Sequence, residues 1–132
     1  MIRQLSVFVE NRPGSFRQET ELLRQHRIET EAFCSVDSPE FGILRLIVDQ
    51  PEEAEHVLAA QGLLIKNYDV IEVAVEDMES LDALLLACTE SNVNINYMYS
   101  SFGGEHGQSV IFHCEYLEET ESMLRAKGFV CR

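Results

Sequence analysis

The sequence predicts an α+β fold made of two tandem βαββαβ units, over residues 1–68 and 69–132. Two observations support this prediction. Stretches of alternating apolar residues and stretches of helical apolar spacing follow one another in the order strand, helix, strand, strand, helix, strand. The same order then returns in the second half, where Ile71 takes the place of Leu5.

This order is the split βαβ, or ferredoxin-like, pattern. Its usual form is an antiparallel sheet with both helices packed on one face. We therefore expect two tandem ferredoxin-like units with antiparallel sheets and helices on one face. The 132 residues are enough for one ordinary domain or two small ones, and 45% of them are hydrophobic, so the chain can bury a core.

The first half begins with a strand in which Leu5, Val7 and Val9 alternate with less apolar residues. A helix is expected from Ser15, which with Gln18 three positions later has the spacing of a capping box. The other elements expected in this half are strands near residues 28–36 and 42–48, a helix that begins near Pro51 and ends at Gly62, and a strand from Leu63.

The second half repeats this order element by element. Ile71, Val73 and Val75 alternate as a strand, and a helix is expected where Leu81, Leu84, Leu85 and Cys88 have the spacing i, i+3, i+4, i+7. Residues 102–107 predict a glycine-rich hairpin loop, which lacks the following helix that a phosphate-binding loop needs. Only residues 129–132 remain for a short last strand.

The chain is strongly acidic, with a formal net charge of −13. Its first half carries 7 basic and 11 acidic residues, and its second half carries 3 and 12. Such a charge disfavours approach to phosphate backbones and anionic membranes, so we expect neither nucleic acid nor a membrane as partner. The N-terminus has no signal-peptide pattern and the four cysteines form no CxxC motif, which favours a cytoplasmic protein with reduced thiols.

The most distinctive local feature is Asn11-Arg12-Pro13-Gly14-Ser15, between the first strand and the first helix. Pro13 suits a helix entry, Gly14 lets the backbone turn sharply, and Asn11 can donate and accept hydrogen bonds. The free N–H groups of the first helical turn suit a carboxylate. The pattern is equally compatible with a tight, well-capped turn that binds nothing.

Here the sequence resembles the ACT domains, which are regulatory modules that bind small molecules, most often amino acids. The resemblance rests on the strand ending Val-Phe-Val-Glu, the Asn-Arg-Pro-Gly loop, and the matching Val73–Asp77 and Val93–Tyr97 segments, and it covers nearly the whole chain. It implies a ligand between the first loop of one unit and the second strand of a neighbouring unit. The residues to which it points are Asn11, Pro13, Gly14, Ser15, Asp77 and Asn94.

The two units differ at these positions. The loop of the second unit contains Asp77 and lacks both Pro and Gly, while the first unit has Glu29 where the second has Asn94. We therefore expect one hybrid site, which joins the Asn11 loop to Asn94. The opposite pairing, of the Asp77 loop with Glu29, is expected to be inactive or to bind a cation.

The sequence thus predicts an amino-acid-binding regulatory or sensor protein, a homodimer without catalytic activity, cofactor or metal site. His113-Cys114-Glu115 looks like a metal motif, but consecutive strand residues point to opposite faces. One alternative is a ferredoxin-like structural or protein-interaction module that binds no ligand. Another is a small hydrolase, for which Arg12 is the available guanidinium.

Overall fold

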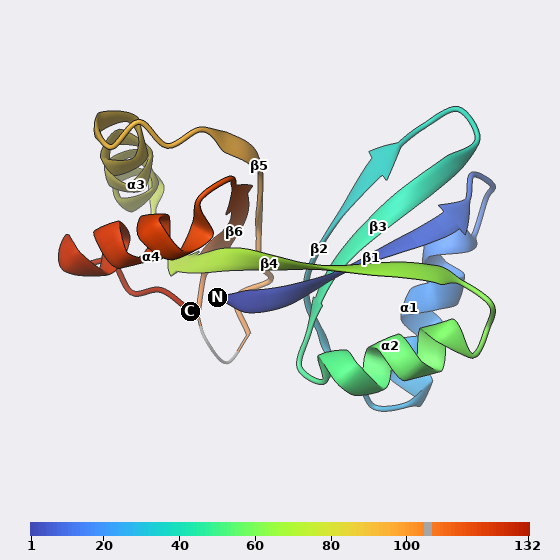
Figure 1. Cartoon of the computed structure of the whole chain (residues 1–132). Helices are drawn as coiled ribbons and strands as arrows, with labels where there is room; N and C mark the ends of the chain where they lie inside the picture. The colour runs from blue at the N-terminus through green and yellow to red at the C-terminus, as the bar shows by residue number, and fades with distance from the viewer. Residues whose placement is uncertain (105–106) are drawn as a thin grey trace. The chain divides into compact units, whose positions relative to one another are not determined.

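The computed structural model describes residues 1–104 and 107–132, and this part of the chain contains six strands and four helices (Figure 1). Two compact units make up the chain. The N-terminal unit is residues 3–68, and the C-terminal unit is residues 69–132 together with Met1 and Ile2. The boundary lies within one strand, β4, which spans Leu64–Ala74.

The N-terminal unit has the sheet order β2-β3-β1-β4, with neighbouring strands antiparallel where their register is defined. One face of this sheet carries the apolar core. Leu5, Val7 and Val9 of β1 pack there against Leu23 of the first helix and Leu58 of the second. The elements before β4 are β1 (Ile2–Glu10), α1 (Ser15–Gln25), β2 (Thr30–Asp37), β3 (Phe41–Val48) and α2 (Pro51–Ala59).

The C-terminal unit has the order β4-β6-β5 and a second core of the same design. Ile71 and Val73 of β4 pack with Leu84 and Leu124 from its two helices, and all four side chains are buried. Its elements after β4 are α3 (Met78–Glu90), β5 (Ile95–Ser100), β6 (Ser109–Cys114) and α4 (Leu117–Ala126). The predicted α+β fold with tandem ferredoxin-like units is therefore confirmed.

The predicted last strand is reduced to an isolated bridge between Val73 and Cys131. Backbone hydrogen bonds at 2.9 to 3.0 Å join Glu72 and Ala74 of β4 to Arg132 and Val130. These bonds involve too few residues to form a continuous strand, although they hold the segment against β4. Residues 105–106 of the predicted glycine-rich loop lie outside the described residues.

The predicted capping box at the start of α1 is wrong. Gly14, not Ser15, is the residue before the helix; it adopts a left-handed conformation with φ 86°, and no side chain caps the helix. Ser15 consequently becomes the first helical residue, and its hydroxyl group cannot reach back to the N–H groups of the following turn. A capping box is instead present at α3, where the Asp77 carboxylate accepts a hydrogen bond from the Ser80 N–H at 2.8 Å.

The two units end their first helices in the same way. Arg27 after α1 and Asn92 after α3 are the two non-glycine residues with positive φ among those described, at 58° and 57°. In each case the next N–H bonds back across the last turn, from Ile28 to the Leu23 carbonyl at 3.0 Å and from Val93 to the Cys88 carbonyl at 2.8 Å. This is the Schellman arrangement, which favours glycine at the left-handed position.

Arg27→Gly is expected to raise the free energy of unfolding by about 1 kcal/mol, because glycine adopts the left-handed conformation without a Cβ clash. Asn92→Gly is the matched control in the other unit. Asparagine tolerates this conformation better than arginine, so the gain there is expected to be smaller. Urea unfolding of both variants measures the difference. Equal gains, or a loss for Arg27→Gly, would contradict the assignment of backbone strain to Arg27.

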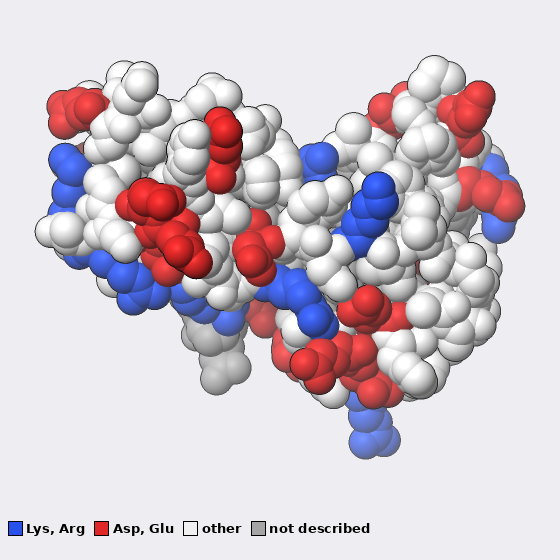
Figure 2. All heavy atoms as spheres, viewed as in Figure 1, with Lys and Arg blue, Asp and Glu red and all other residues white. Residues whose placement is uncertain are grey.

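None of the helices in the described ranges is both long enough and apolar enough to cross a membrane. Acidic side chains are spread over the visible face of the molecule rather than gathered in one patch (Figure 2).

Candidate functional site

A pocket of about 480 Å³ lies where β1 leads into α1 in the N-terminal unit, and we call it the loop pocket. It brings together four of the residues predicted from the sequence: Asn11, Arg12, Gly14 and Ser15. Pro13 is exposed in the same turn but is not part of the lining. The other lining residues are Glu10, Phe16, Arg17, Ser35, Val36, Asp37 and Gly42, so the second strand of the same unit supplies one wall.

Two polar side chains of the loop are already held in place. The Asn11 amide donates to the Asp37 carboxylate at 3.1 Å and to the Ser38 carbonyl at 3.4 Å. The Arg12 guanidinium donates to the Glu10 carboxylate at 2.8 Å and to the Gln18 side-chain carbonyl at 3.1 Å. These bonds fix the loop conformation. They also leave Arg12 only part of its five donors for a ligand.

The start of α1 presents unused hydrogen-bonding groups. Ser15 is only 5% exposed, and its hydroxyl oxygen is buried without a hydrogen-bond partner in the described structure. The backbone N–H groups of Phe16 and Arg17 likewise bond to no carbonyl among the described residues. A Cβ built at Gly14 would meet no atom within 4 Å, so the space beside Gly14, just before these donors, is open. Such a helix start is suited to a carboxylate.

Glu19 is buried one helical turn after Ser15, on the same face of α1. Burial raises the pKa of its carboxyl group, and the positive charge of Arg12 only partly offsets this effect. With the Glu10 and Asp37 carboxylates in the lining, the neighbourhood of the helix start is acidic. The loop region therefore combines donors for an anion with carboxylates for a cation, as a zwitterion requires.

The corresponding loop of the C-terminal unit is arranged differently. Asp77 caps α3, and the Ser80 hydroxyl accepts from the N–H groups of Glu76 and Asp77, each at 3.0 Å. Hydrogen bonds from the Ser80 N–H and hydroxyl groups hold the pKa of the Asp77 carboxyl group below its usual value. The carboxylate thus occupies the position where an anionic ligand would bind.

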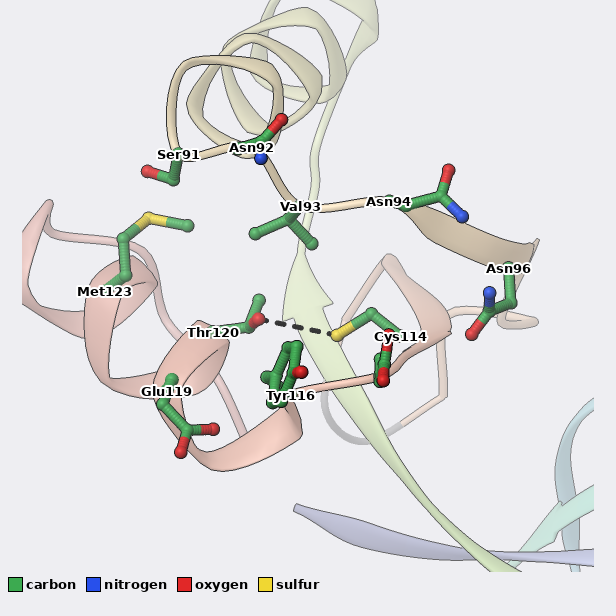
Figure 3. A pocket seen from close by; sticks show the side chains of 11 residues that line it. Ser91, Asn92, Val93, Asn94, Asn96, Cys114, Tyr116, Glu119, Thr120 and Met123 are labelled. Atoms are coloured by element: carbon green, nitrogen blue, oxygen red, sulfur yellow. Dashed lines mark hydrogen bonds between the residues drawn. The ribbon is translucent and has the colours of Figure 1, made fainter.

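Asn94 lines a second pocket, of about 360 Å³ (Figure 3). This pocket lies beside the end of α3, whereas Asp77 caps its start. We call it the amide pocket, because Asn92, Asn94 and Asn96 line one side of it. Since α3 has 13 residues, its two ends lie about 20 Å apart, and one unit does not bring Asp77 and Asn94 together. The other lining residues are Ser91, Val93, Cys114, Glu115, Tyr116, Glu119, Thr120 and Met123.

The sequence prediction missed several residues of both pockets. Asp37, 26 residues after Asn11 in the chain, accepts a hydrogen bond from the Asn11 side chain, and no local sequence pattern predicts this contact. The alternation of Asn92, Asn94 and Asn96 was a usable signal for the amide pocket. Among the described residues, no group of three or more His, Cys, Asp or Glu side chains could hold a metal ion.

The fold and these pockets define a class: small α+β proteins made of paired ferredoxin-like units with pockets at the strand–helix turns. A family model for the ACT domain pair matches residues 1–129. The chain therefore belongs to the ACT domain pair family, as the resemblance found in its sequence predicts.

Solved structures show the same fold. Protein BT0572 from Bacteroides thetaiotaomicron superposes with a TM-score of 0.87 at 27% sequence identity, over 99% of this chain and 91% of that one. The ligand-free regulatory subunit of aspartate kinase from Thermus thermophilus gives a TM-score of 0.63 at 17% identity, over 96% and 92% of the two chains. The corresponding subunit from Thermus flavus gives 0.61 at 18%, over 94% and 88%. No curated protein matches the chain.

Proposed function

We propose that this protein is a regulatory module that binds an amino acid in the loop pocket and has no catalytic activity of its own. The observation that carries the proposal is the buried, unpartnered hydroxyl of Ser15 at the start of α1, beside the free N–H groups of Phe16 and Arg17. An unpaired buried polar group is costly, and a ligand carboxylate that accepts a hydrogen bond from it would remove the cost.

The neighbouring carboxylates would receive the ammonium group of the same ligand. Glu10 and Asp37 line the pocket, and neither is fully paired by its single bond from Arg12 or Asn11. Membership of the ACT domain pair family supports a regulatory, ligand-binding role. The likeness to a subunit described as regulatory, and as free of ligand, points in the same direction.

A second copy of the chain would complete the pocket, and a homodimer is the form that we propose for the protein. Asn94 is the candidate residue on the facing chain, since it directly precedes β5, the second strand of the C-terminal unit. Ligand binding would then change the assembly state, and a cytoplasmic partner protein would bind one assembly state in preference to the other. Sedimentation with and without ligand measures this, and a monomer at every concentration would remove the homodimer from the proposal.

Hydrolysis of a small ester or acyl phosphate is not favoured. Such an enzyme needs a guanidinium that is free to bind an oxyanion, whereas two side chains, Glu10 and Gln18, already engage Arg12. No observation in the loop pocket therefore supports a second function.

Ser15→Ala is expected to change stability and binding in opposite directions. Removal of the unpaired hydroxyl should raise the free energy of unfolding by about 1 kcal/mol, while the amino-acid ligand should bind about tenfold more weakly. Urea unfolding and calorimetric titration with each common amino acid measure the two quantities. A variant that loses stability and keeps its affinity would contradict the proposed role of Ser15.

Asn11→Ala combined with Gly14→Val should abolish binding, because the loop conformation and the open space before the helix are both lost. Gly62→Val is the matched control for backbone strain. Gly62 also has positive φ, at 80°, and also has no atom within 4 Å of a built Cβ, but it lies outside the loop pocket. Full binding by the Asn11/Gly14 variant would refute the proposed site.

A further inference from the structure

We propose that the amide pocket is a separate binding site for a small organic cation, a primary ammonium group on a short apolar chain. All the residues that line it belong to the C-terminal unit. The site is therefore complete within one unit, although it shares Asn94 with the proposed amino-acid site.

The equivalent position in the N-terminal unit is sealed by its own residues. The Asp49 carboxylate accepts a hydrogen bond from the Glu29 N–H at 2.9 Å, and the Asp49 N–H donates to the Glu29 carbonyl at 3.1 Å. The Gln50 amide donates to the Arg27 carbonyl at 3.1 Å. These bonds join the turn after α1 to the turn before α2, so the side chains that could bind a ligand are used internally.

The C-terminal unit has lost this seal. Glu115 and Tyr116 take the places of Asp49 and Gln50, and Asn94 takes the place of Glu29. Within the described residues, the side chains of Glu115, Tyr116 and Asn94 form no hydrogen bond with the protein. The turn after α3 and the turn before α4 are therefore not tied together by side chains, and a pocket of about 360 Å³ separates them. That volume is within the range of about 300–1,000 Å³ for small-molecule sites.

The charge of the lining selects a cation. It includes two carboxylates, Glu115 and Glu119, and no Lys, Arg or His. The whole unit is acidic as well, because residues 67–132 carry 3 basic and 12 acidic side chains. The start of α4 offers backbone N–H groups, but an anion there would also meet both carboxylates and no basic side chain. An ammonium group could donate to the carboxylates and to the amide oxygens of Asn92 and Asn94.

The floor of the pocket is suited to an apolar chain. Val93 points toward the pair formed by Cys114 and Thr120, and the Met123 side chain extends toward Val93 (Figure 3). In that pair the Cys114 thiol donates to the Thr120 hydroxyl oxygen at 3.4 Å, so the buried polar groups at the bottom are already satisfied. A ligand thus meets apolar atoms below and carboxylates and amides at the rim, which fits a cationic head on a short aliphatic chain.

Titration of ¹⁵N-labelled protein with n-butylammonium chloride tests the proposal at constant ionic strength. Parallel titrations use three control compounds. Sodium butyrate and n-butanol have a similar alkyl chain without the ammonium group, and calcium chloride supplies a cation without an alkyl chain. The side-chain amide signals of Asn92 and Asn94 are expected to shift saturably with n-butylammonium alone. Equal shifts with butyrate or butanol, or saturable shifts with calcium, would overturn the assignment to an organic cation.

Glu115→Gln combined with Glu119→Gln keeps the shape of the pocket and removes its charge. The dissociation constant for n-butylammonium should rise about fivefold, since each exposed ion pair contributes modestly. Glu52→Gln with Glu53→Gln is the matched control, because it changes the net charge equally at exposed positions of α2. An equal rise in both double variants would show general charge attraction and overturn the site.

A variant that closes the amide pocket tests the proposal without removing negative charge. Glu115→Asp and Tyr116→Gln together restore the two side chains that close the N-terminal unit, Asp49 and Gln50, and leave the net charge unchanged. Saturable binding of n-butylammonium should be lost although the net charge is the same, and retained binding would overturn the proposal. Amino-acid binding at the loop pocket is read separately, from the backbone signals of Gly14 and Ser15, so the failure of one proposal is distinguishable from the failure of the other.

Discussion

Leu84→Ala is expected to lower the free energy of unfolding of the C-terminal unit by about 2–5 kcal/mol. Leu84 lies on α3, is fully buried, and packs in the core with Ile71, Phe112 and Leu124. Its truncation removes the transfer free energy of the side chain and leaves a cavity that the surrounding residues fill only in part. Urea unfolding followed by far-UV circular dichroism measures the loss.

Leu86→Ala is the matched control on the same helix. Its side chain is 53% exposed, so the same truncation creates no cavity and should change stability by about 0.5 kcal/mol at most. The two variants make the same Leu→Ala substitution at a buried and at an exposed position of one helix. If the two variants lose the same stability, the buried face of α3 has been assigned to the wrong residues.

Arg132→Met is expected to destabilise the C-terminal unit by about 3–5 kcal/mol, because it leaves a buried carboxylate without its cation. Glu72 in β4 has a side chain only 5% exposed, and Arg132 forms an ion pair with it. The second carboxylate oxygen accepts from the Ser109 hydroxyl at 2.7 Å, which is not enough to replace a positive charge. Thermal and urea unfolding measure the loss.

Glu72→Gln combined with Arg132→Met should recover most of that stability, since no buried charge then remains unpaired. Arg24→Met is the exposed counterpart: Arg24 pairs with Glu21 at 2.7 Å on the surface of α1, where solvent screens the pair. It should change stability little. A loss in Arg24→Met as large as that in Arg132→Met would show that charge removal, and not burial, causes the effect.

The order of the elements could be predicted because it depends on local patterns that repeat. Leu5, Val7 and Val9 alternate along a strand and are buried on its core face, and Ile71, Val73 and Val75 are buried in the same way. Apolar alternation identifies the face of a strand that carries the core, because every second side chain points to the same face. The family could be predicted for a similar reason, because the Asn-Arg-Pro-Gly turn is a contiguous motif.

The details of the helix starts could not be predicted in this way. Ser15 with Gln18 fits a capping box by spacing, yet the left-handed conformation of Gly14 places Ser15 inside the helix. Asp77 with Ser80 has a less usual pairing for this motif and forms the box. Spacing does not determine which of two adjacent residues takes the non-helical position, since that depends on how the strand before it enters the helix.

The sequence by itself determined that this protein is acidic, that it repeats one βαββαβ pattern, and that its first loop differs from its second. These properties follow from residue types and their spacing along the chain. Only the tertiary structure decided which polar groups are used and which are free. The buried Ser15 hydroxyl, the pairing of Glu72 with Arg132, and the seal at Asp49 that is missing at Glu115 each depend on partners distant in sequence or on burial. Hydrogen-bond satisfaction is a property of packed atoms in space, and a linear pattern does not specify it.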